Sequence, residues 1–324
     1  MDVINGIGNA KNRFHNAVLV IGIFDGLHIG HQKLITQAVN RALELKTKAV
    51  VLTFSPHPMR VLHPEYHFKK ISSLPYRLKL LDQFGVGAVV VAKFSKRFAQ
   101  MSPERFAKNY LRGALNATEV FVGDDFRFGM ERQGTIARFG ELAKRLGFTL
   151  RIVPQVLQGF EKISSTLIRR MIEGGELALA EKWLGRRFGI MGLVEHGDGR
   201  GQKLGFPTIN VYPDPLQILP PQGVYAVYVE VNKKIYAGVA NLGFRKTFHT
   251  SRPGVNLEAY LFDFHKNIYG KDVVVQFVEK IRDELKFDSV SALSAQMKKD
   301  VKRARSITGN LLLNNNNMLF RFDK

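Results

Sequence analysis

The spacing of apolar residues changes once along this chain, near Gly185, and the change limits the folds open to it. Before that point, short β-branched runs alternate with segments whose apolar residues recur every three or four positions, such as Leu34, Ile35, Ala38 and Ala42. This alternation predicts an α/β fold, an open parallel sheet covered by helices. The strands expected in this half are residues 17–24, 49–54, 87–94, 118–123 and 149–154.

After Gly185, apolar runs follow one another with only short connections between them. Several consecutive strands predict an antiparallel β-barrel. We expect a hairpin that turns at Asn232–Lys234, and helical spacing returns over residues 289–305 as a terminal helix. The strands expected in this half are residues 224–231, 234–242, 256–262 and 273–278.

Two such patterns within 324 residues predict two domains, residues 1–185 and 186–305. Residues 306–324 include a run of four asparagines and show no apolar period, which predicts a loose tail whose removal leaves stability unchanged. In an open parallel sheet, ligands bind beyond the carboxyl ends of the strands. We therefore look for the first site where these strands end.

Composition excludes several kinds of site. The chain has no cysteine, so disulfides, thiolate zinc sites and cysteine nucleophiles are ruled out. It has no run of 18 apolar residues and no apolar segment near its N-terminus, so a cytoplasmic protein without a membrane partner is expected.

The charge implies an anionic partner, because Lys and Arg outnumber Asp and Glu by 48 to 28, a formal net charge of +20. Nucleic acid and small phosphorylated substrates both fit. The densest basic run, residues 298–305, is expected on the solvated face of the terminal helix, and the other cations are dispersed. Dispersed charge favours nucleotide substrates over an RNA-binding groove.

The segment GIFDGLHIGHQKL, residues 22–34, is expected where a strand ends and a helix begins. The first N–H groups of a helix lack internal partners and attract phosphate. Gly26 and Gly30 allow a ligand to approach the backbone closely, and His28 and His31 can donate hydrogen bonds to phosphate oxygens. No HExxH pattern accompanies the two histidines, which argues against a metal site. Two surface histidines at a helix start remain the alternative.

A second segment, ISSTLIRRMI, offers further groups for phosphate. It places Ser164, Ser165 and Thr166 at a helix N-terminus, with Arg169 one turn further on. Hydroxyl groups and a guanidinium can hold phosphate oxygens there. Taken alone, serine and threonine before an apolar helix are simply a helix cap.

The segment GDGRGQKLGFPTINV, residues 197–211, is rich in glycine but matches neither a Walker A motif nor GxGxxG. A hairpin tip is the alternative for such a loop. Thr208 and Asn210 are two residues apart, so an extended backbone turns both side chains to one face. Their oxygens suit Mg²⁺, and Arg200 and Lys203 could lie near phosphates.

These motifs together resemble a known family. HIGH after a strand is similar to the signature of the nucleotidylyltransferase superfamily. With TFSPHP, FVGDDFRFG and ISSTLIR, it resembles the adenylyltransferase half of the bacterial bifunctional riboflavin kinase/FAD synthetase. The glycine-rich loop followed by PTIN, with PQGVYA, ANLGFRKTF and LEAYLFDFHKNIYG, resembles the kinase half. The resemblance runs from about residue 17 to Arg305.

The resemblance implies a Rossmann-like nucleotidylyltransferase domain followed by a riboflavin kinase barrel. The kinase would convert riboflavin and ATP to FMN and ADP with Mg²⁺, and the first domain would join AMP to FMN, giving FAD and pyrophosphate. In the first domain the implied ATP-binding residues are Gly22, Phe24, Asp25, Gly26, His28, Gly30, His31, Ser164, Ser165, Thr166 and Arg169, and Pro56, His57, Asp125 and Arg127 would bind flavin or nucleotide.

In the second domain the family places its catalytic base at Glu258. Without the resemblance, a carboxylate on a strand is more simply a solvent-facing residue. The implied ATP-binding residues of this domain are Gly199, Arg200, Gly201, Lys203, Gly205, Pro207, Thr208 and Asn210, the last two as metal ligands, while His28 and His31 serve the catalysis of the first domain.

The sequence departs from the family at two positions, with Lys246 where proline is usual and Tyr260 where histidine is usual. An adenylyltransferase with another phosphate acceptor, such as phosphopantetheine, is the nearest rival but leaves the second half unexplained. An RNA-binding protein with a degenerate HIGH fold would fit the charge, yet RRM, KH and zinc-finger patterns are absent. The sequence does not indicate an oligomeric state.

Overall fold

The computed structural model of the chain describes residues 1–159, 161–197, 201, 204–245 and 254–312. The chain divides into two compact units. The first contains Met1–Phe68 and Leu74–Ser164, and the second contains Lys69–Ser73 and Ser165–Lys324. The helices after Ser164 therefore group with the second half of the chain, some twenty residues before the change of apolar spacing.

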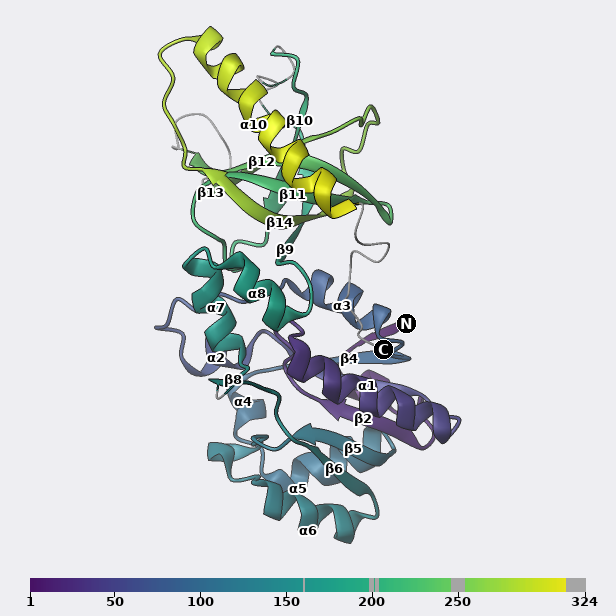
Figure 1. Cartoon of the computed structure of the whole chain (residues 1–324). Coiled ribbons are helices and arrows are strands. Elements are labelled where there is room, and N and C mark those ends of the chain that lie inside the picture. Colours follow the sequence, from purple (N-terminus) through teal and green to yellow (C-terminus); the bar gives the residue numbers. More distant parts are fainter. Residues whose placement is uncertain (160, 198–200, 202–203, 246–253, 313–324) are drawn as a thin grey trace. The chain divides into compact units, whose positions relative to one another are not determined.

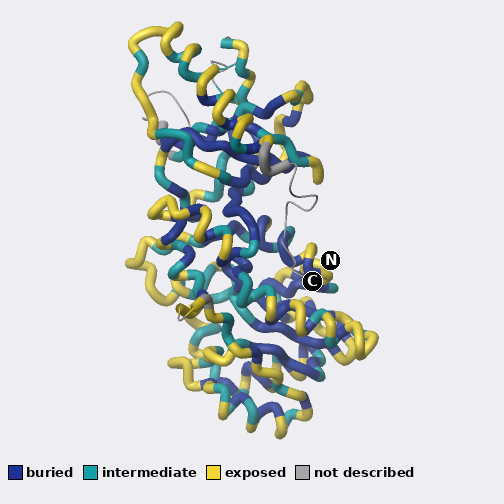
Figure 2. Tube along the Cα trace, viewed as in Figure 1, coloured by how far each residue is buried: buried dark blue, intermediate teal, exposed yellow. Residues whose placement is uncertain are grey.

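The first unit is built on a six-stranded parallel sheet with the strand order β1-β4-β3-β2-β5-β6 (Figure 1). Its inner strands β2, β3 and β4 are mostly apolar, as expected when helices cover both faces of a sheet. Figure 2 shows these strands as buried. The strands are β1 (Asp2–Asn5), β2 (Ala17–Ile21), β3 (Ala49–Ser55), β4 (Ala88–Lys93), β5 (Ala117–Gly123) and β6 (Thr149–Val153).

Helices and one small hairpin complete the first unit. The helix α1 follows β2 and lies against it, which confirms the predicted strand-to-helix order. The longer helices are α1 (Ile29–Glu44), α3 (Leu74–Gln83) and α6 (Ile136–Leu146), and the shorter ones are α2 (Pro58–Leu62), α4 (Lys96–Ala99), α5 (Pro103–Phe106), η1 (Ile7–Ala10), the π-helix η2 (Ala107–Ala114) and η3 (Met130–Arg132), with a hairpin of β7 (Leu157–Gln158) and β8 (Glu161–Lys162).

The second unit is a closed six-stranded barrel with the order β10-β13-β12-β11-β14-β9, every neighbouring pair antiparallel. The predicted barrel is therefore confirmed. Helices α7 (Ser165–Glu173) and α8 (Leu177–Leu184) precede the barrel. Its strands are β9 (Gly189–Glu195), β10 (Thr208–Pro213), β11 (Gly223–Val231), β12 (Lys234–Arg245), β13 (Gly254–Leu261) and β14 (Asp272–Arg282).

The hairpin between β11 and β12 turns where the sequence predicted. Asn232 and Lys233 form the two-residue connection, and both have positive φ, 48° and 66°. Two successive left-handed residues characterise the type I′ turn, whose twist matches the flanking strands. Because the turn pairs Val231 with Lys234, it sets the register of the longest ladder in the barrel.

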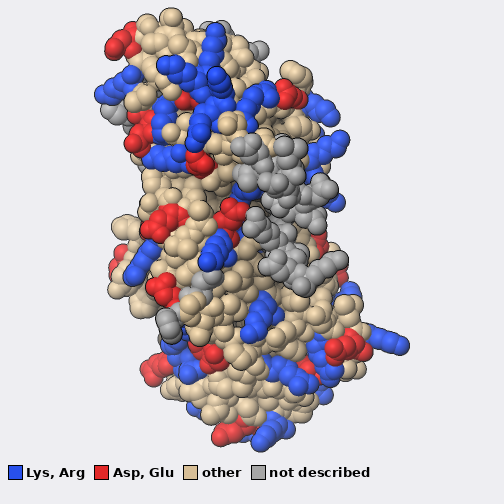
Figure 3. Space-filling model, in the orientation of Figure 1, with Lys and Arg blue, Asp and Glu red and all other residues tan. Residues whose placement is uncertain are grey.

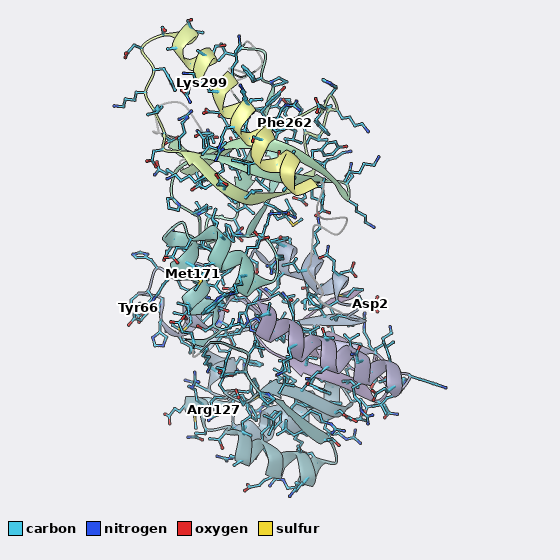
Figure 4. All side chains as sticks on the ribbon, in the orientation of Figure 1. Asp2, Tyr66, Arg127, Met171, Phe262 and Lys299 are labelled. Carbon is cyan, nitrogen blue, oxygen red and sulfur yellow. The ribbon has the colours of Figure 1, made fainter. Side chains whose placement is uncertain are left out.

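The terminal helix α10 (Val290–Leu312) lies across β11 and β12. Its basic residues face solvent, as predicted: Lys and Arg gather over this helix in Figure 3, and Lys299 projects from it in Figure 4. Two of its arginines are paired, Arg303 with Glu279 at 3.2 Å and Arg305 with Asp263 at 3.1 Å. Among the described helices, none combines the length and apolarity needed to cross a membrane.

The end of α10 differs from the sequence prediction. Thr308 is only 1% exposed, and its backbone oxygen accepts a 2.7 Å hydrogen bond from the buried hydroxyl of Tyr228 on β11. Ile307 packs against the cluster that contains Ala226, Phe262 and Ala304. The expectation of a loose tail from residue 306 is therefore wrong for residues 306–309. Although the apolar residues of this segment show no clear helical spacing, its helix still packs against the barrel wall. The asparagine run lies outside the described residues.

We expect a chain that ends at Arg305 to melt at a lower temperature than a chain that ends at Leu312. The shorter chain loses the acceptor of the Tyr228 hydroxyl and the packing of Ile307 and Thr308 on the barrel, which costs about 1–3 kcal/mol, or roughly 5 °C for a unit of this size. Differential scanning calorimetry of the two chains measures the difference. Equal melting temperatures would show that residues 306–312 add nothing to the barrel.

Candidate active sites

The loop between β2 and α1 forms a tight turn that ends in a histidine cap. Leu27 N donates to Phe24 O at 3.2 Å, and φ is positive at Phe24 (55°), Gly26 (79°) and Leu27 (40°). His28 is the N-cap of α1, and its Nδ1 accepts a hydrogen bond from the backbone N of His31 at 3.4 Å. The predicted position of the two histidines, at a helix start beyond a strand end, is confirmed.

The imidazole rings of His28 and His31 stack on one another, with centroids 3.6 Å apart and planes 19° apart. The ring of Phe24 meets His31 edge-on at 5.3 Å. His28 is 7% exposed, so this ring is held by packing, and the first turn of α1 adds backbone N–H groups and a positive dipole end. Among the described residues, no group of three or more His, Asp or Glu side chains could hold a metal ion.

Two glycines of this loop are required by close contacts with rings. A Cβ at Gly22 would lie 2.7 Å from the ring of Phe24, which folds back over the strand end. A Cβ at Gly30 would lie 3.3 Å from the ring of His28. A side chain at either position would displace the aromatic stack, so both glycines support the geometry of the histidine pair.

The acidic residue of the motif is buried. Asp25 is 2% exposed and interacts electrostatically with Arg77 of α3. Burial lowers the pKa of the Arg77 guanidinium, and the charge of Asp25 opposes this shift. The sequence interpretation missed Arg77, because a lone arginine in a helix resembles any surface residue.

Asp125 and Arg127, which follow β5, are exposed, whereas His57, which follows β3, is half-buried. Asp125 forms an ion pair with Lys162 at 3.3 Å and is 64% exposed, and Arg127 donates to Phe126 O at 2.8 Å on the surface of the first unit (Figure 4). His57 caps α2 by accepting from Met59 N at 3.2 Å.

The imidazole of His57 also stacks on the ring of Phe68 at 4.1 Å. The neighbouring Pro56 is exposed at the start of the same loop. Both residues thus lie just beyond the carboxyl end of β3, the edge of a parallel sheet where ligands bind.

The hydroxyl residues of the second motif fall on both sides of the unit boundary. Ser164 ends the first unit, whereas Ser165 begins α7 in the second unit. Thr166 is exposed in the first turn of α7, and Arg169 is half-buried one turn further on. The helix start predicted for this segment is confirmed.

The barrel brings three predicted residues onto one face. Asn210 of β10 lies opposite Glu258 of β13, and Thr208 lies opposite Tyr260. Directly opposed residues on neighbouring strands point to the same face, as do residues two apart on one strand. Thr208, Asn210 and Glu258 therefore share a face, and Asn241 of β12 lies opposite Glu258 on its other side.

A cavity of about 270 Å³ opens on this face of the barrel. Thr208, Glu258 and Tyr260 line it from the strands, and Tyr260 meets Phe206 edge-on at 5.5 Å. Much of the remaining wall comes from the end of β14, the loop that follows it and α10, none of which the sequence interpretation had assigned to a site. That part of the wall consists of Arg282, Glu284, Leu285, Phe287, Leu293, Met297, Asp300 and Val301.

Hydrogen bonds fix the polar groups of this cavity. Arg282 holds the buried Asp300 through Nε at 3.0 and 3.1 Å and through Nη2 at 2.7 Å, which ties the end of β14 to α10. Asn241 Nδ2 donates to Glu284 Oε1 at 3.1 Å. Asn256 Nδ2 donates to Glu258 Oε1 at 2.8 Å and orients that carboxylate.

The described part of the glycine-rich loop lies close to the two magnesium-binding positions predicted from PTIN. A Cβ at Gly197 would collide with the amide of Asn210, and a Cβ at Gly201 would collide with Phe206 O and lie 3.1 Å from Thr208 Oγ1. Gly205 has φ 82°. Pro207 is exposed, and the predicted residues Gly199, Arg200 and Lys203 lie outside the described residues, as does Lys246.

Two family models match the chain and divide it between them. The model described as FAD synthetase matches residues 10–167, and the model described as riboflavin kinase matches residues 184–308. The first region contains the histidine turn, and the second contains the barrel cavity. The fold and sites thus define a chain with one FAD synthetase region and one riboflavin kinase region.

Curated relatives match nearly the whole chain. The protein named bifunctional riboflavin kinase/FMN adenylyltransferase of Bacillus subtilis is 38% identical over 304 residues, 93% of this chain and 95% of its own. The relatives of the same name from Haemophilus influenzae and Escherichia coli K12 are 37% and 35% identical, over 94% and 95% of this chain and 99% and 98% of their own. The chain belongs to the bifunctional riboflavin kinase/FMN adenylyltransferase family.

A solved structure that carries a different name has the same fold. The crystal structure of a protein called a macrolide-efflux protein, from Streptococcus pneumoniae, is 34% identical, with a TM-score of 0.80, and the match covers 94% of this chain and 99% of that one. That name describes the Streptococcus protein alone. The structure of the Streptococcus protein matches this chain over almost all residues, so the two chains share one fold.

Proposed function

We propose that this chain makes FMN from riboflavin and ATP in its barrel, and then FAD from FMN and ATP in its parallel-sheet domain. The observation that carries the proposal is that each of the two family models covers one candidate site of its own. The proposed functional domains are residues 1–185 and 186–305, and the packing of Ile307 and Thr308 on the barrel extends the second to residue 309. Because both steps consume ATP, the proposed location is the cytoplasm. The proposed substrates and products are riboflavin, ATP, FMN and FAD. None of them requires a nucleic acid or a membrane as a partner.

In the kinase step, the ribityl 5′-hydroxyl attacks the γ-phosphorus of ATP, and ADP leaves. We assign Glu258 as the general base, since its carboxylate lies on the face of Thr208 and Asn210 and is oriented by Asn256. A positioned carboxylate accepts the hydroxyl proton as the bond to phosphorus forms. Phosphoryl transfer needs little more than this positioning and the neutralisation of charge.

The donor set of the barrel fits Mg²⁺. Thr208 and Asn210 offer a hydroxyl and an amide oxygen on one face, and Mg²⁺ prefers such oxygens while keeping waters and substrate phosphates as its other ligands. Gly197 of the glycine-rich loop lies so close to the amide of Asn210 that no side chain would fit at residue 197. When bound, the ion would neutralise charge on the ATP phosphates.

We assign the barrel cavity to riboflavin. Its wall is apolar at Leu285, Phe287 and Met297, as suits a flat aromatic ring system, and it carries polar groups at Arg282 and Glu284. Glu258 lines the same cavity, so a flavin bound there has its ribityl chain within reach of the base.

In the adenylyl step, the phosphate of FMN attacks the α-phosphorus of ATP, and pyrophosphate leaves. His28 and His31 would hold phosphate oxygens at the start of α1. The family resemblance adds Ser164, Ser165, Thr166 and Arg169 as further donors. Gly22, Phe24, Gly26 and Gly30 shape the turn beneath the triphosphate, and Asp25 supports it from the buried side. The attacking phosphate is already ionised, so no base and no covalent intermediate are needed.

Four residues beyond the strand ends are assigned to flavin or nucleotide in this step. Pro56 and His57 follow β3, and Asp125 and Arg127 follow β5. These strand ends belong to the edge of the sheet at which the histidine turn also lies.

Glu258→Gln is expected to stop FMN formation from riboflavin while conversion of supplied FMN to FAD continues. Glutamine keeps the shape and the hydrogen bond to Asn256 but cannot accept the proton, so the kinase rate should fall by roughly 10²–10⁴. Chromatography of the flavins formed with ATP and Mg²⁺ measures both steps. Undiminished FMN formation would remove Glu258 from the mechanism.

Replacement of His28 and His31 together by alanine is expected to abolish FAD formation and leave FMN formation intact. Loss of a transition-state phosphate contact costs roughly 10²–10³ in rate. The kinase rate of the same preparation serves as the internal control for folding of the barrel. A double variant that adenylylates FMN at the normal rate would disprove the assignment of the phosphate site.

A further inference from the structure

The arginine of α3, Arg77, is buried, and neither of the proposed reaction steps assigns it a role. Arg77 is 3% exposed, and its Nη1 donates to the backbone oxygen of Ile23 and, at 3.4 Å, to Thr53 Oγ1. Thr53 is fully buried on β3, and its hydroxyl donates to the same oxygen of Ile23 at 3.1 Å. One backbone carbonyl is therefore held by side chains from two other elements.

This carbonyl lies at the entrance to the histidine turn. Ile23 lies just after β2, and the next four residues form the turn that ends at the cap, His28. Left-handed backbone at Phe24 and Leu27 costs roughly 1–2 kcal/mol for each residue. A turn of this kind persists only where its surroundings over-determine it, and the hydrogen bonds to Ile23 do so at one end.

A charge at this place requires an explanation, because a buried guanidinium is expensive and an apolar side chain would fill the space more cheaply. An apolar side chain, however, cannot donate directed hydrogen bonds. Arg77 donates along fixed N–H bonds to Ile23 and Thr53, and these hydrogen bonds hold the entrance of the turn. Its charge also interacts electrostatically with the buried Asp25 inside the turn.

We propose that Arg77 is a positioning residue for adenylyl transfer, which with Thr53 fixes the Ile23 carbonyl and so places His28 and His31 against the phosphates. The inference rests on the proposed function of the histidine pair. Arg77 itself touches no substrate. Its effect passes through the five-residue path from Ile23 to His28, so it should appear in the rate of the chemical step.

Arg77→Met tests this inference, because methionine fills the space without the directed donors. We expect kcat for FAD formation from FMN and ATP to fall by roughly 10²-fold, since a misplacement of about 1 Å has that effect. The KM for FMN should stay within about threefold, as other residues would hold the flavin. The kinase rate of the same protein should not change.

Arg41→Met is the matched control. Arg41 lies near the other end of α1 and binds Glu119 of β5 at 2.7 Å, so its loss removes an equally well-paired arginine far along the helix from the histidines. This variant should lower the melting temperature and leave kcat unchanged. An equal fall of kcat in both variants would mean that helix stability, and not the position of the turn, explains the effect.

Rescue separates position from stability further. Arg77→Ala leaves a guanidinium-sized space, and added guanidinium ion should restore part of kcat, whereas NaCl of equal ionic strength should not. If Arg77→Met fails to fold, Thr53→Val carries the test, with the same direction of change in kcat. A retained kcat, a change in the KM for FMN alone, or no rescue would overturn the inference.

The activity of the wild-type protein separates failure of the proposed function from failure of the inference about Arg77. If it makes no FAD from FMN, the proposed function fails and the inference fails with it. If it makes FAD and Arg77→Met makes FAD as fast, the inference alone fails.

Discussion

A shift of one residue between β10 and β13 would turn Glu258, the proposed base of the kinase step, away from Asn210. The pairing of Asn210 with Glu258, and of Glu258 with Asn241, depends on the ladders that β13 forms with β10 and with Gly238–Arg245 of β12. Side chains alternate across a strand, so register alone decides which of them meet. The two-residue turn at Asn232 and the closure of the barrel leave this register no freedom to slip.

In the first unit, a turn and not a strand ladder fixes the positions of the proposed site residues. Its histidines lie on no strand, and their position depends on the end of β2, the left-handed residues that follow it and the cap at the start of α1. Buried polar groups around Ile23 supply the restraint that sheet register supplies in the barrel. In both units the proposed site residues are carried by backbone that strand pairing or buried hydrogen bonds hold in place.

The sequence predicted the elements well, because their signals are local. The apolar runs that became β2 and β11, the turn at Asn232 and the helix starts at His28 and Ser165 depend on residues close in the chain. The short edge strand β1 was missed, since four residues with one buried side chain give no period.

What could not be predicted depends on partners distant in sequence. Arg77 meets Ile23 across 54 residues, and Arg282 meets Asp300 across the loop before α10, so neither pair leaves a spacing to recognise. Thr308 was assigned to a tail. Its backbone oxygen accepts a hydrogen bond from Tyr228, 80 residues earlier, and no local pattern in the asparagine-rich segment indicates that contact. Asp25 belongs to a recognisable motif, yet only the structure shows that it is buried beside Arg77.

The fate of two phosphorus atoms tests the central claim, that one chain carries out both steps in sequence. Riboflavin is incubated with the purified protein, Mg²⁺ and ATP labelled at either the γ- or the α-phosphorus, and the label in isolated FAD is counted. The account predicts one labelled phosphate in FAD from each form of ATP, the γ-phosphorus in the flavin half and the α-phosphorus in the adenylyl half. FAD that carries neither label, or no FAD at all, would contradict it.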